Sequence, residues 1–223
     1  MALSRLIRRL QGPVAAAAML ARNLLRARRL APVEPRTQGD YRFEGMGRRH
    51  LAGALALYAG LHDGKPLDPA RRLLYRLAGG RLGVVALDPE RRVVAAGFYG
   101  FSPRDLHEGR VHAAFSGVLP AHRGRGLATE VRRTAILHFR ANGLTGYSSR
   151  ISADNVASLK ASHKLGFRVV DRYTDAARGE ARCYLVCDFD NDFRDSNPRD
   201  ADPTGSTAAD RDSRLNPAKD SAR

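Results

Sequence analysis

The stretch VLPAHRGRGLATEV, residues 118–131, is the feature that most constrains how this chain folds. An apolar, strand-like run ends near Val118, Pro120 turns the chain, and a helix-like run begins near Leu127. The loop between them alternates arginine with glycine. Backbone amides at the start of a helix have no acceptor within that helix and carry the positive end of its dipole. The stretch therefore predicts a strand–loop–helix unit that holds an anion such as a diphosphate.

The spacing excludes two well-known phosphate loops. A Walker loop would continue with Gly-Lys-Ser or Gly-Lys-Thr, and a dinucleotide fingerprint needs a different glycine spacing with an acid on the following strand. Neither is present. Spacing by itself leaves one alternative open, a solvent-exposed glycine turn that binds nothing.

Strand-like and helix-like patterns alternate around this unit. We expect strands over 41–46, over both halves of 81–101 around a turn at 88–89, and over 110–119, 146–151, 167–175 and 181–189. We expect helices over 48–61, 68–79, 127–143 and 155–166. This order predicts a mixed sheet with helices packed against it.

A second pattern, NVASLKASHKLGF, occupies residues 155–167. A helix capped by Asn155 ends at Gly166 and leads directly into a strand. Together the two patterns resemble the Gcn5-related N-acetyltransferase (GNAT) family over roughly residues 40–189. The resemblance implies an α+β fold with a central mixed, mostly antiparallel seven-stranded sheet, flanked by about four helices.

The resemblance also implies a binding site for acetyl-CoA, which serves as the acyl donor. The family's Arg/Gln-x-x-Gly-x-Gly/Ala signature falls on Arg123, Gly126 and Ala128. The amides of this loop would hold the pyrophosphate, and Val118 would pair with the pantetheine arm like an added strand. The implied cofactor-binding residues are Val118, Arg123, Gly124, Arg125, Gly126, Leu127, Ala128 and Asn155. No metal is implied.

His112 is the candidate general base. Several family members have a glutamate at this position, six residues before that of Val118. Without a bulge, His112 would share a strand face with Ala114, Ser116 and Val118. An imidazole with an ordinary pKa can accept a proton near neutral pH. An ordinary exposed strand histidine is the alternative, and then Glu108 or its neighbour His107 would be the base.

The general acid is harder to assign. Many family members have a tyrosine at the position of Ser162, and serine is a poor acid. Water, Tyr147 or Tyr173 could supply the proton instead. The histidines show no metal-binding spacing, so no metal ligands are expected.

The chain has 223 residues and a formal net charge of +15. Such a charge favours an anionic partner, although arginine scattered by coding bias gives the same excess. No nucleic-acid-binding motif is present, so we expect no specific nucleic acid. Cys183 and Cys187 would lie about 13 Å apart on one strand face, too far for a disulfide. We therefore expect two free, buried thiols and a cytoplasmic protein.

The two ends differ from the middle. Residues 1–36 form a basic amphipathic segment and linker, 37–189 the folded domain, and 190–223 a tail too polar to fold. Residues 1–30 contain no acid, and Gly12-Pro13 should kink or split their helix. This segment has three alternatives: peripheral membrane contact, packing on the domain or on a second copy in a homodimer, or removal as a targeting segment.

The sequence thus favours an acyltransferase of class EC 2.3.1, an N-acetyltransferase. It would transfer the acetyl group of acetyl-CoA to a primary amine by direct attack in a ternary complex. Nucleotide sugars, amino acids, peptide N-termini and polyamines are all open as acceptors. Two alternatives are a catalytically degenerate acyl-CoA-binding regulatory module of the same fold, and a basic nucleic-acid-binding protein.

Overall fold

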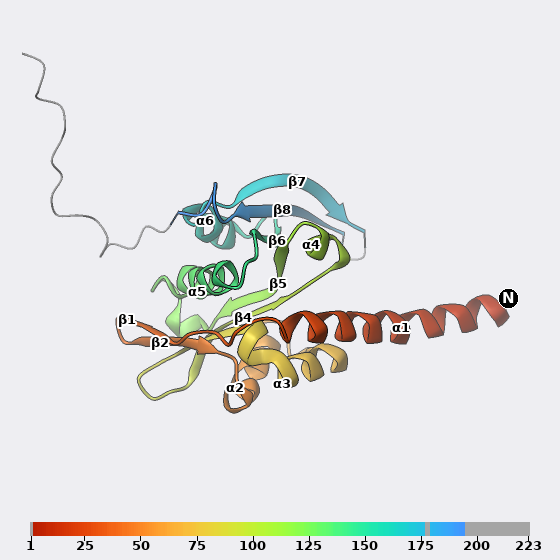
Figure 1. The fold of residues 1–223 in the computed structure, drawn as a ribbon, viewed down its shortest axis with the longest axis horizontal. Coiled ribbons are helices and arrows are strands. Elements are labelled where there is room, and N and C mark those ends of the chain that lie inside the picture. Colours follow the sequence, from red (N-terminus) through yellow and green to blue (C-terminus); the bar gives the residue numbers. More distant parts are fainter. Residues whose placement is uncertain (1, 177–178, 195–223) are drawn as a thin grey trace, which may run out of the picture.

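The computed structural model describes residues 2–176 and 179–194, with side chains from residue 12 onward (Figure 1). An eight-stranded sheet forms its centre, in the order β1-β2-β3-β4-β5-β6-β8-β7. The strands are β1 (Arg36–Gln38), β2 (Tyr41–Gly45), β3 (Gly83–Leu87), β4 (Val93–Gly100), β5 (Arg110–Val118), β6 (Gly146–Ser152), β7 (Arg168–Asp175) and β8 (Glu180–Asp188). The helices are α1 (Ala2–Ala27), α2 (Arg48–Gly60), α3 (Pro69–Leu82), α4 (Pro103–His107), α5 (Leu127–Ala141) and α6 (Val156–Lys164). Neighbouring strands are antiparallel except β5 and β6, which are parallel.

Helices cover both faces of the central strands. On one face, Phe98 of β4 contacts Tyr58 of α2 and Tyr75 of α3, with ring centroids 5.9 and 4.7 Å apart. On the other face, Tyr99 contacts Phe139 of α5 at 5.4 Å. We call these the α2 face and the α5 face. Because β3 and most of β4 are buried on both sides, their sequences are continuous apolar runs and do not alternate.

Two irregularities of β5 shape the region around the glycine loop. The register between β4 and β5 shifts between Phe98 and Tyr99, so Ala114 has no partner on β4. The parallel pairing of β5 with β6 covers only Arg110–Ala113 and Gly146–Ser149. Among the residues that the structure describes, positions 114–118 therefore have no strand partner on the β6 side. We call these residues the unpaired edge of β5.

The structure confirms the mixed, mostly antiparallel sheet and the helices and strands expected from the sequence. It adds β1, in a stretch expected to be a linker, and α4, in a stretch expected to be a loop. The described chain thus has eight strands where seven were expected. Its six α-helices are the four expected around the sheet, the added α4, and α1 in the N-terminal segment. Both additions were missed because elements of three and five residues contain too little periodicity to be recognised.

The N-terminal helix continues unbroken through Pro13, so the expected split does not occur. One proline removes one backbone hydrogen bond, and the turns on either side of it persist. The last turns of α1 pack on the domain. Asn23 and Ala27 are each 2 % exposed, and the Asn23 amide exchanges hydrogen bonds of 2.7 and 3.2 Å with the backbone of Phe101. Packing on the domain, one of the three alternatives, is therefore observed for this end of α1.

Three further expectations concern the rest of the chain. Cys183 and Cys187 are free and buried, as expected. Within the described residues, no helix is long and apolar enough to cross a membrane. The expected disordered tail falls almost entirely on residues 195–223, which lie outside the described residues.

Candidate active site

Gly124 and Gly126 determine the backbone of the loop that joins β5 to α5. Both have a φ angle of 77°. This left-handed conformation costs any other residue about 1–2 kcal/mol. A Cβ atom at either glycine would meet no atom within 4 Å, so the space beside the loop is open. The glycines are therefore needed for the backbone path, and they leave room for a ligand to approach it closely.

Consecutive backbone amides from Gly124 to Ala128 have no hydrogen-bond acceptor within the described part of the chain. The next two amides, of Thr129 and Glu130, donate to the carbonyl of Gly126 at 2.9 and 3.1 Å. Gly126 is the N-cap of α5 and has no side chain that could cap the preceding amides. A row of unpaired amides at the positive end of a helix is a suitable site for phosphate oxygens.

The two arginines of the loop differ in their contacts. Arg125 Nη1 donates to Tyr41 Oη on β2 at 2.8 Å, and that hydroxyl lies 3.2 Å from His122 Nδ1. Arg123 is exposed and has no partner among the described residues. A guanidinium in that position can bind a phosphate beside the amides.

Val118 and Asn155 lie on the elements that the sequence analysis expected. Val118 pairs with Ala95 on β4, and its other side belongs to the unpaired edge of β5. An extended ligand can pair with such an edge as an added strand. Asn155 is exposed and accepts the backbone amide of Ser158 at 3.0 Å as the N-cap of α6. Its side-chain carbonyl already accepts one hydrogen bond, and its NH₂ group is free to donate to a ligand.

Arg132 connects the helices of the two sequence motifs and was missed by the sequence analysis. Its side chain is 4 % exposed and donates to the carbonyl of Ala128 at 3.3 Å and to Ser158 Oγ at 3.5 Å. The signal that could have revealed it is an arginine on the buried face of an amphipathic helix. Its charge lies directly behind the first turn of α5, where it adds to the positive helix terminus.

The β-bulge at Ala114 changes the direction of His112. The sequence analysis placed His112 on the same face as Ala114, Ser116 and Val118 if no bulge intervened. A bulge does intervene, and past it the alternation of β5 is inverted. His112 lies opposite Gly100, a position that belongs to the α2 face, whereas Val118 remains on the α5 face.

His112 belongs to a hydrogen-bonded chain of three side chains. Its Nδ1 lies 2.8 Å from Ser148 Oγ, and that hydroxyl donates to Asp105 Oδ1 at 2.7 Å. An ionised Asp105 only accepts hydrogen bonds, so the single hydroxyl hydrogen of Ser148 is directed at it. His112 Nδ1 must then donate to Ser148, which leaves the lone pair on Nε2. The chain fixes the tautomer in which Nε2 is the basic nitrogen.

Burial lowers the pKa of His112 to about 4. Desolvation is the main cause, and the positive charges of Arg150, Arg182 and Arg71 lower it further, whereas Asp105 acts in the opposite direction. The imidazole is therefore neutral at pH 7 and able to accept a proton. Its low pKa means that the proton must pass quickly to solvent.

Glu108, the alternative base, is less suitable. Its carboxylate forms ion pairs with Arg104, at 2.9 Å, and with Arg110. The hydrogen bond from Arg104 is the main reason why the pKa of Glu108 is lowered. His107, the other alternative, is exposed at the end of α4. A carboxylate engaged by two guanidiniums is a weak proton acceptor.

The structure does not favour Ser162, Tyr147 or Tyr173 as a general acid. Ser162 is fully buried and donates to the carbonyl of Ser158 at 2.9 Å, within its own helix. Tyr147 is also fully buried, and desolvation raises its pKa to about 12. Tyr173 lies on β7, next to β8 at the edge of the sheet. Protonation by water fits this arrangement best. The described residues contain no group of three or more side chains that could hold a metal ion.

A mixed sheet with an anion-binding glycine loop between a strand and a helix is typical of acyltransferases that use coenzyme A. Comparison with known proteins tests this interpretation. Residues 65–168 match the family model described as an acetyltransferase (GNAT) domain. No curated protein matches the chain significantly. Residues 65–168 are therefore similar to the GNAT acetyltransferase domain, and the resemblance expected from the two motifs is confirmed.

Solved structures support the same fold. The protein yncA from Salmonella typhimurium, solved with its cofactor acetyl-CoA, is 22 % identical, and the match covers 68 % of this chain and 95 % of that chain with a TM-score of 0.58. An N-acetyltransferase from Staphylococcus aureus is 19 % identical, and the match covers 68 % of this chain and 99 % of that chain with a TM-score of 0.58. A ribosomal-protein-S5-alanine acetyltransferase from Vibrio fischeri is 13 % identical, and the match covers 72 % of this chain and 100 % of that chain with a TM-score of 0.59.

Proposed function

We propose that this protein is an N-acetyltransferase that transfers the acetyl group of acetyl-CoA to a primary amine by direct attack. The observation that carries the proposal is the position of the unpaired amides of residues 124–128 next to the unpaired edge of β5. The amides suit a diphosphate, and the edge suits an extended arm with amide groups. Coenzyme A contains both, joined in this order. The family match and the acetyl-CoA in the Salmonella structure support the same donor.

In the proposed complex, the pyrophosphate accepts hydrogen bonds from the loop amides and from Arg123. The pantetheine arm pairs with the unpaired edge of β5 next to Val118. The thioester then lies along β5 in the direction of His112. Because Arg150 and Arg182 act electrostatically on His112, an acceptor amine that also carries a carboxylate or phosphate is favoured over a polyamine.

The chemistry follows from these positions. The neutral amine attacks the thioester carbonyl carbon, a C–N bond forms, and the C–S bond breaks. The proton lost by the amine passes to Nε2 of His112 and from there to solvent. The leaving thiolate takes a proton from water. His112 thus removes the proton that would otherwise make the amine the better leaving group.

The proposal is tested by thermal unfolding with and without acetyl-CoA, in the wild type and in Ala128→Glu and Ala128→Gln. Ala128 lies in the first turn of α5, where an acid stabilises the helix, so Ala128→Glu should fold. Gly126 is less suitable, because any side chain there is strained. A ligand that binds only the folded state raises the unfolding midpoint.

We expect acetyl-CoA to raise the midpoint of the wild type and of Ala128→Gln, and to have little effect on Ala128→Glu. The glutamate would place a negative charge among the amides that bind the pyrophosphate, and glutamine is its neutral equivalent in size. If saturating acetyl-CoA does not stabilise the wild type, the proposed function is wrong.

A second candidate function is a regulatory module that binds acyl-CoA without turning it over. The observation in its favour is Ser162, which stands where many relatives have a tyrosine and is bonded within its own helix. Stabilisation by acetyl-CoA, with no release of free thiol on a broad panel of amines, would support this alternative. Release of free thiol that depends on an amine would exclude it.

A further inference from the structure

Three helices, α1, α2 and α3, form the helical layer of the α2 face, with α1 beside α3 and α3 beside α2 (Figure 1). Their sequences contain eleven arginines and no aspartate or glutamate. Ordinary protein surfaces intersperse both signs of charge. A layer with charges of one sign attracts an anionic partner. Two acids outside these helices pair with their arginines: Asp68, which caps α3, pairs with Arg71 at 2.7 Å, and Glu44 of β2 pairs with Arg49 at 2.5 Å.

The same layer exposes large apolar side chains. Leu73 and Leu77 of α3 are 43 % and 51 % exposed, and Val14 and Leu25 of α1 are 66 % and 61 % exposed. The other large apolar side chains exposed in the described chain, Leu137, Val156 and Val170, lie on three different elements. Exposed apolar side chains that gather on one layer indicate a binding surface.

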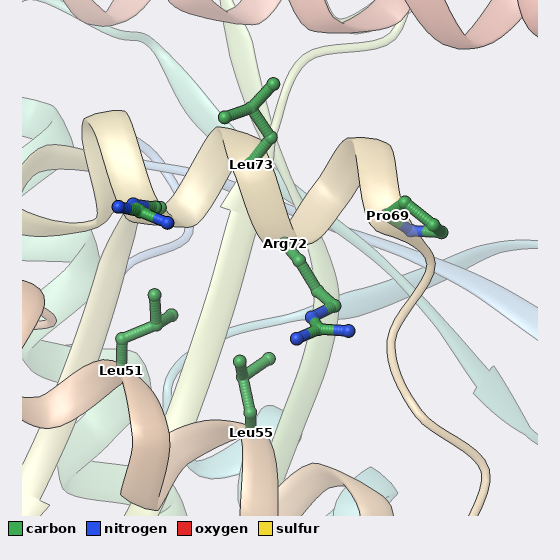
Figure 2. Close-up of a pocket in the computed structure, with 6 residues that line it drawn as sticks. Leu51, Leu55, Pro69, Arg72 and Leu73 are labelled. Carbon is green, nitrogen blue, oxygen red and sulfur yellow. The ribbon is translucent and has the colours of Figure 1, made fainter.

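Arginines and leucines meet in a groove between α2 and α3. The groove is lined by Leu51, Leu55, Pro69, Arg72, Leu73 and Arg76. Figure 2 shows the Arg72 side chain extending toward Leu55, and Leu73 pointing away from α2. An arginine can lay its aliphatic stem on apolar surface and keep its guanidinium at a polar boundary. The groove therefore has apolar walls, and the positive charges of Arg72 and Arg76 lie beside them.

We propose that the outer surface of this layer docks on an anionic lipid bilayer. We call it the arginine–leucine face, and its members are the exposed side chains of Val14, Leu25, Arg72, Leu73, Arg76 and Leu77. The guanidiniums select anionic headgroups over neutral ones. The leucines select a bilayer over a nucleic acid, because phosphates alone would leave them in water. This inference does not depend on the acyl-transfer reaction.

The test is co-sedimentation of the full-length protein with vesicles. One set contains phosphatidylglycerol and phosphatidylcholine at 3:7, and the other contains phosphatidylcholine only. We expect binding to the first set, little binding to the second, and weakening as salt is raised. The double variant Arg72→Gln/Arg76→Gln should bind the anionic vesicles about 25-fold more weakly, at roughly 1 kcal/mol for each arginine. Leu73→Ser/Leu77→Ser should bind them at least about tenfold more weakly.

Leu137→Ser and Arg140→Gln are the matched controls. Both residues are exposed on α5, on the opposite side of the sheet. They should bind the anionic vesicles like the wild type, and unchanged unfolding midpoints show that all variants are folded. Equal binding to both vesicle sets would overturn the proposal. So would equal losses in the controls, or tighter binding to a DNA or RNA duplex that the leucine variants leave unchanged.

Discussion

At the scale of single residues, the candidate site depends on the hydrogen bond between His112 and Ser148. Ser148→Ala removes the acceptor for His112 Nδ1 and the connection to Asp105. The imidazole can then rotate or change tautomer. We expect the rate of acetyl transfer to fall about tenfold or more, as for other residues that orient a catalytic group. Stabilisation by acetyl-CoA should stay unchanged, because Ser148 does not lie at the glycine loop.

Ser149→Ala is the natural control for this variant. Ser149 is the next residue of β6, points to the opposite face of the sheet and is 7 % exposed. Its substitution by alanine removes the same hydroxyl group as Ser148→Ala. We expect its acetylation rate to stay near that of the wild type. Similar losses in both variants would show that β6 is sensitive to any change, and that Ser148 has no orienting role.

The half-buried, desolvated imidazole of His112 also makes the stability of the protein depend on pH. Its pKa is about 4 in the folded protein and about 6.5 in an unfolded chain, so only the unfolded state binds a proton between these values. Stability therefore rises with pH across this window and is lost as the pH falls. Between pH 7.5 and pH 5, the free energy of unfolding should fall by about 2 kcal/mol more in the wild type than in His112→Gln. Urea unfolding at both pH values measures this free energy, and equal pH dependence in the two proteins would contradict a desolvated, neutral imidazole.

At the scale of elements, the sequence predicted features that depend on local patterns better than features that depend on strand pairing. The glycine loop and the Asn155 cap are local, and both lie where the sequence placed them. The face of His112 was predicted only for a strand without a bulge, and the bulge at Ala114 depends on how β5 pairs with β4. The sequence marks Asp105 only as an acid that could orient a cationic amine, although Ser-Pro-Arg-Asp at 102–105 is a capping-box pattern that predicts α4. Its contact with Ser148 spans 43 residues, and no local pattern reveals such a contact.

The turn from α6 to β7 is an element whose geometry permits only glycine. Gly166 has a φ angle of 91°, and a Cβ there would lie 1.7 Å from the carbonyl oxygen of Asp192. Gly143, after α5, has a φ angle of 75° with open space around it. Gly143→Ala should cost about 1 kcal/mol, from backbone conformation alone. Gly166→Ala should cost several times more, since the backbone near Asp192 must also move. Urea unfolding of both variants measures the difference, and equal costs would show that this segment moves aside easily.

At the scale of the whole molecule, the sheet separates two faces with different surroundings. The α5 face includes Val118, and α5 begins at the loop with the unpaired amides. The α2 face includes His112 and is covered by α1, α2 and α3, whose outer surface is the arginine–leucine face. If the layer docks on a bilayer as proposed, the membrane and the candidate base are on the same side of the sheet. An acceptor amine in or near that membrane would then approach the side on which His112 lies.

The boundary of the folded domain is the last property of the whole molecule that the structure makes testable. The sequence analysis proposed that the domain begins at residue 37. However, Ala27, Leu30 and Val33 are 2 %, 4 % and 5 % exposed and belong to the same apolar core as the sheet. Side chains of residues 12–18, in contrast, are almost all exposed. The second half of α1 should therefore contribute to stability, and the part before it should not.

Two truncations separate these cases. Removal of residues 2–18 should leave the unfolding free energy within about 1 kcal/mol of the full-length value, because few buried contacts are lost. Removal of residues 2–33 should cost about 4 kcal/mol or more. It takes Leu30 and Val33 from the core, at about 1.5–3 kcal/mol for each side chain, and it leaves the backbone of Phe101 without the amide of Asn23. Urea unfolding of both truncated proteins decides the matter. Equal stabilities would place the start of the domain at residue 37 and reduce α1 to an appendage.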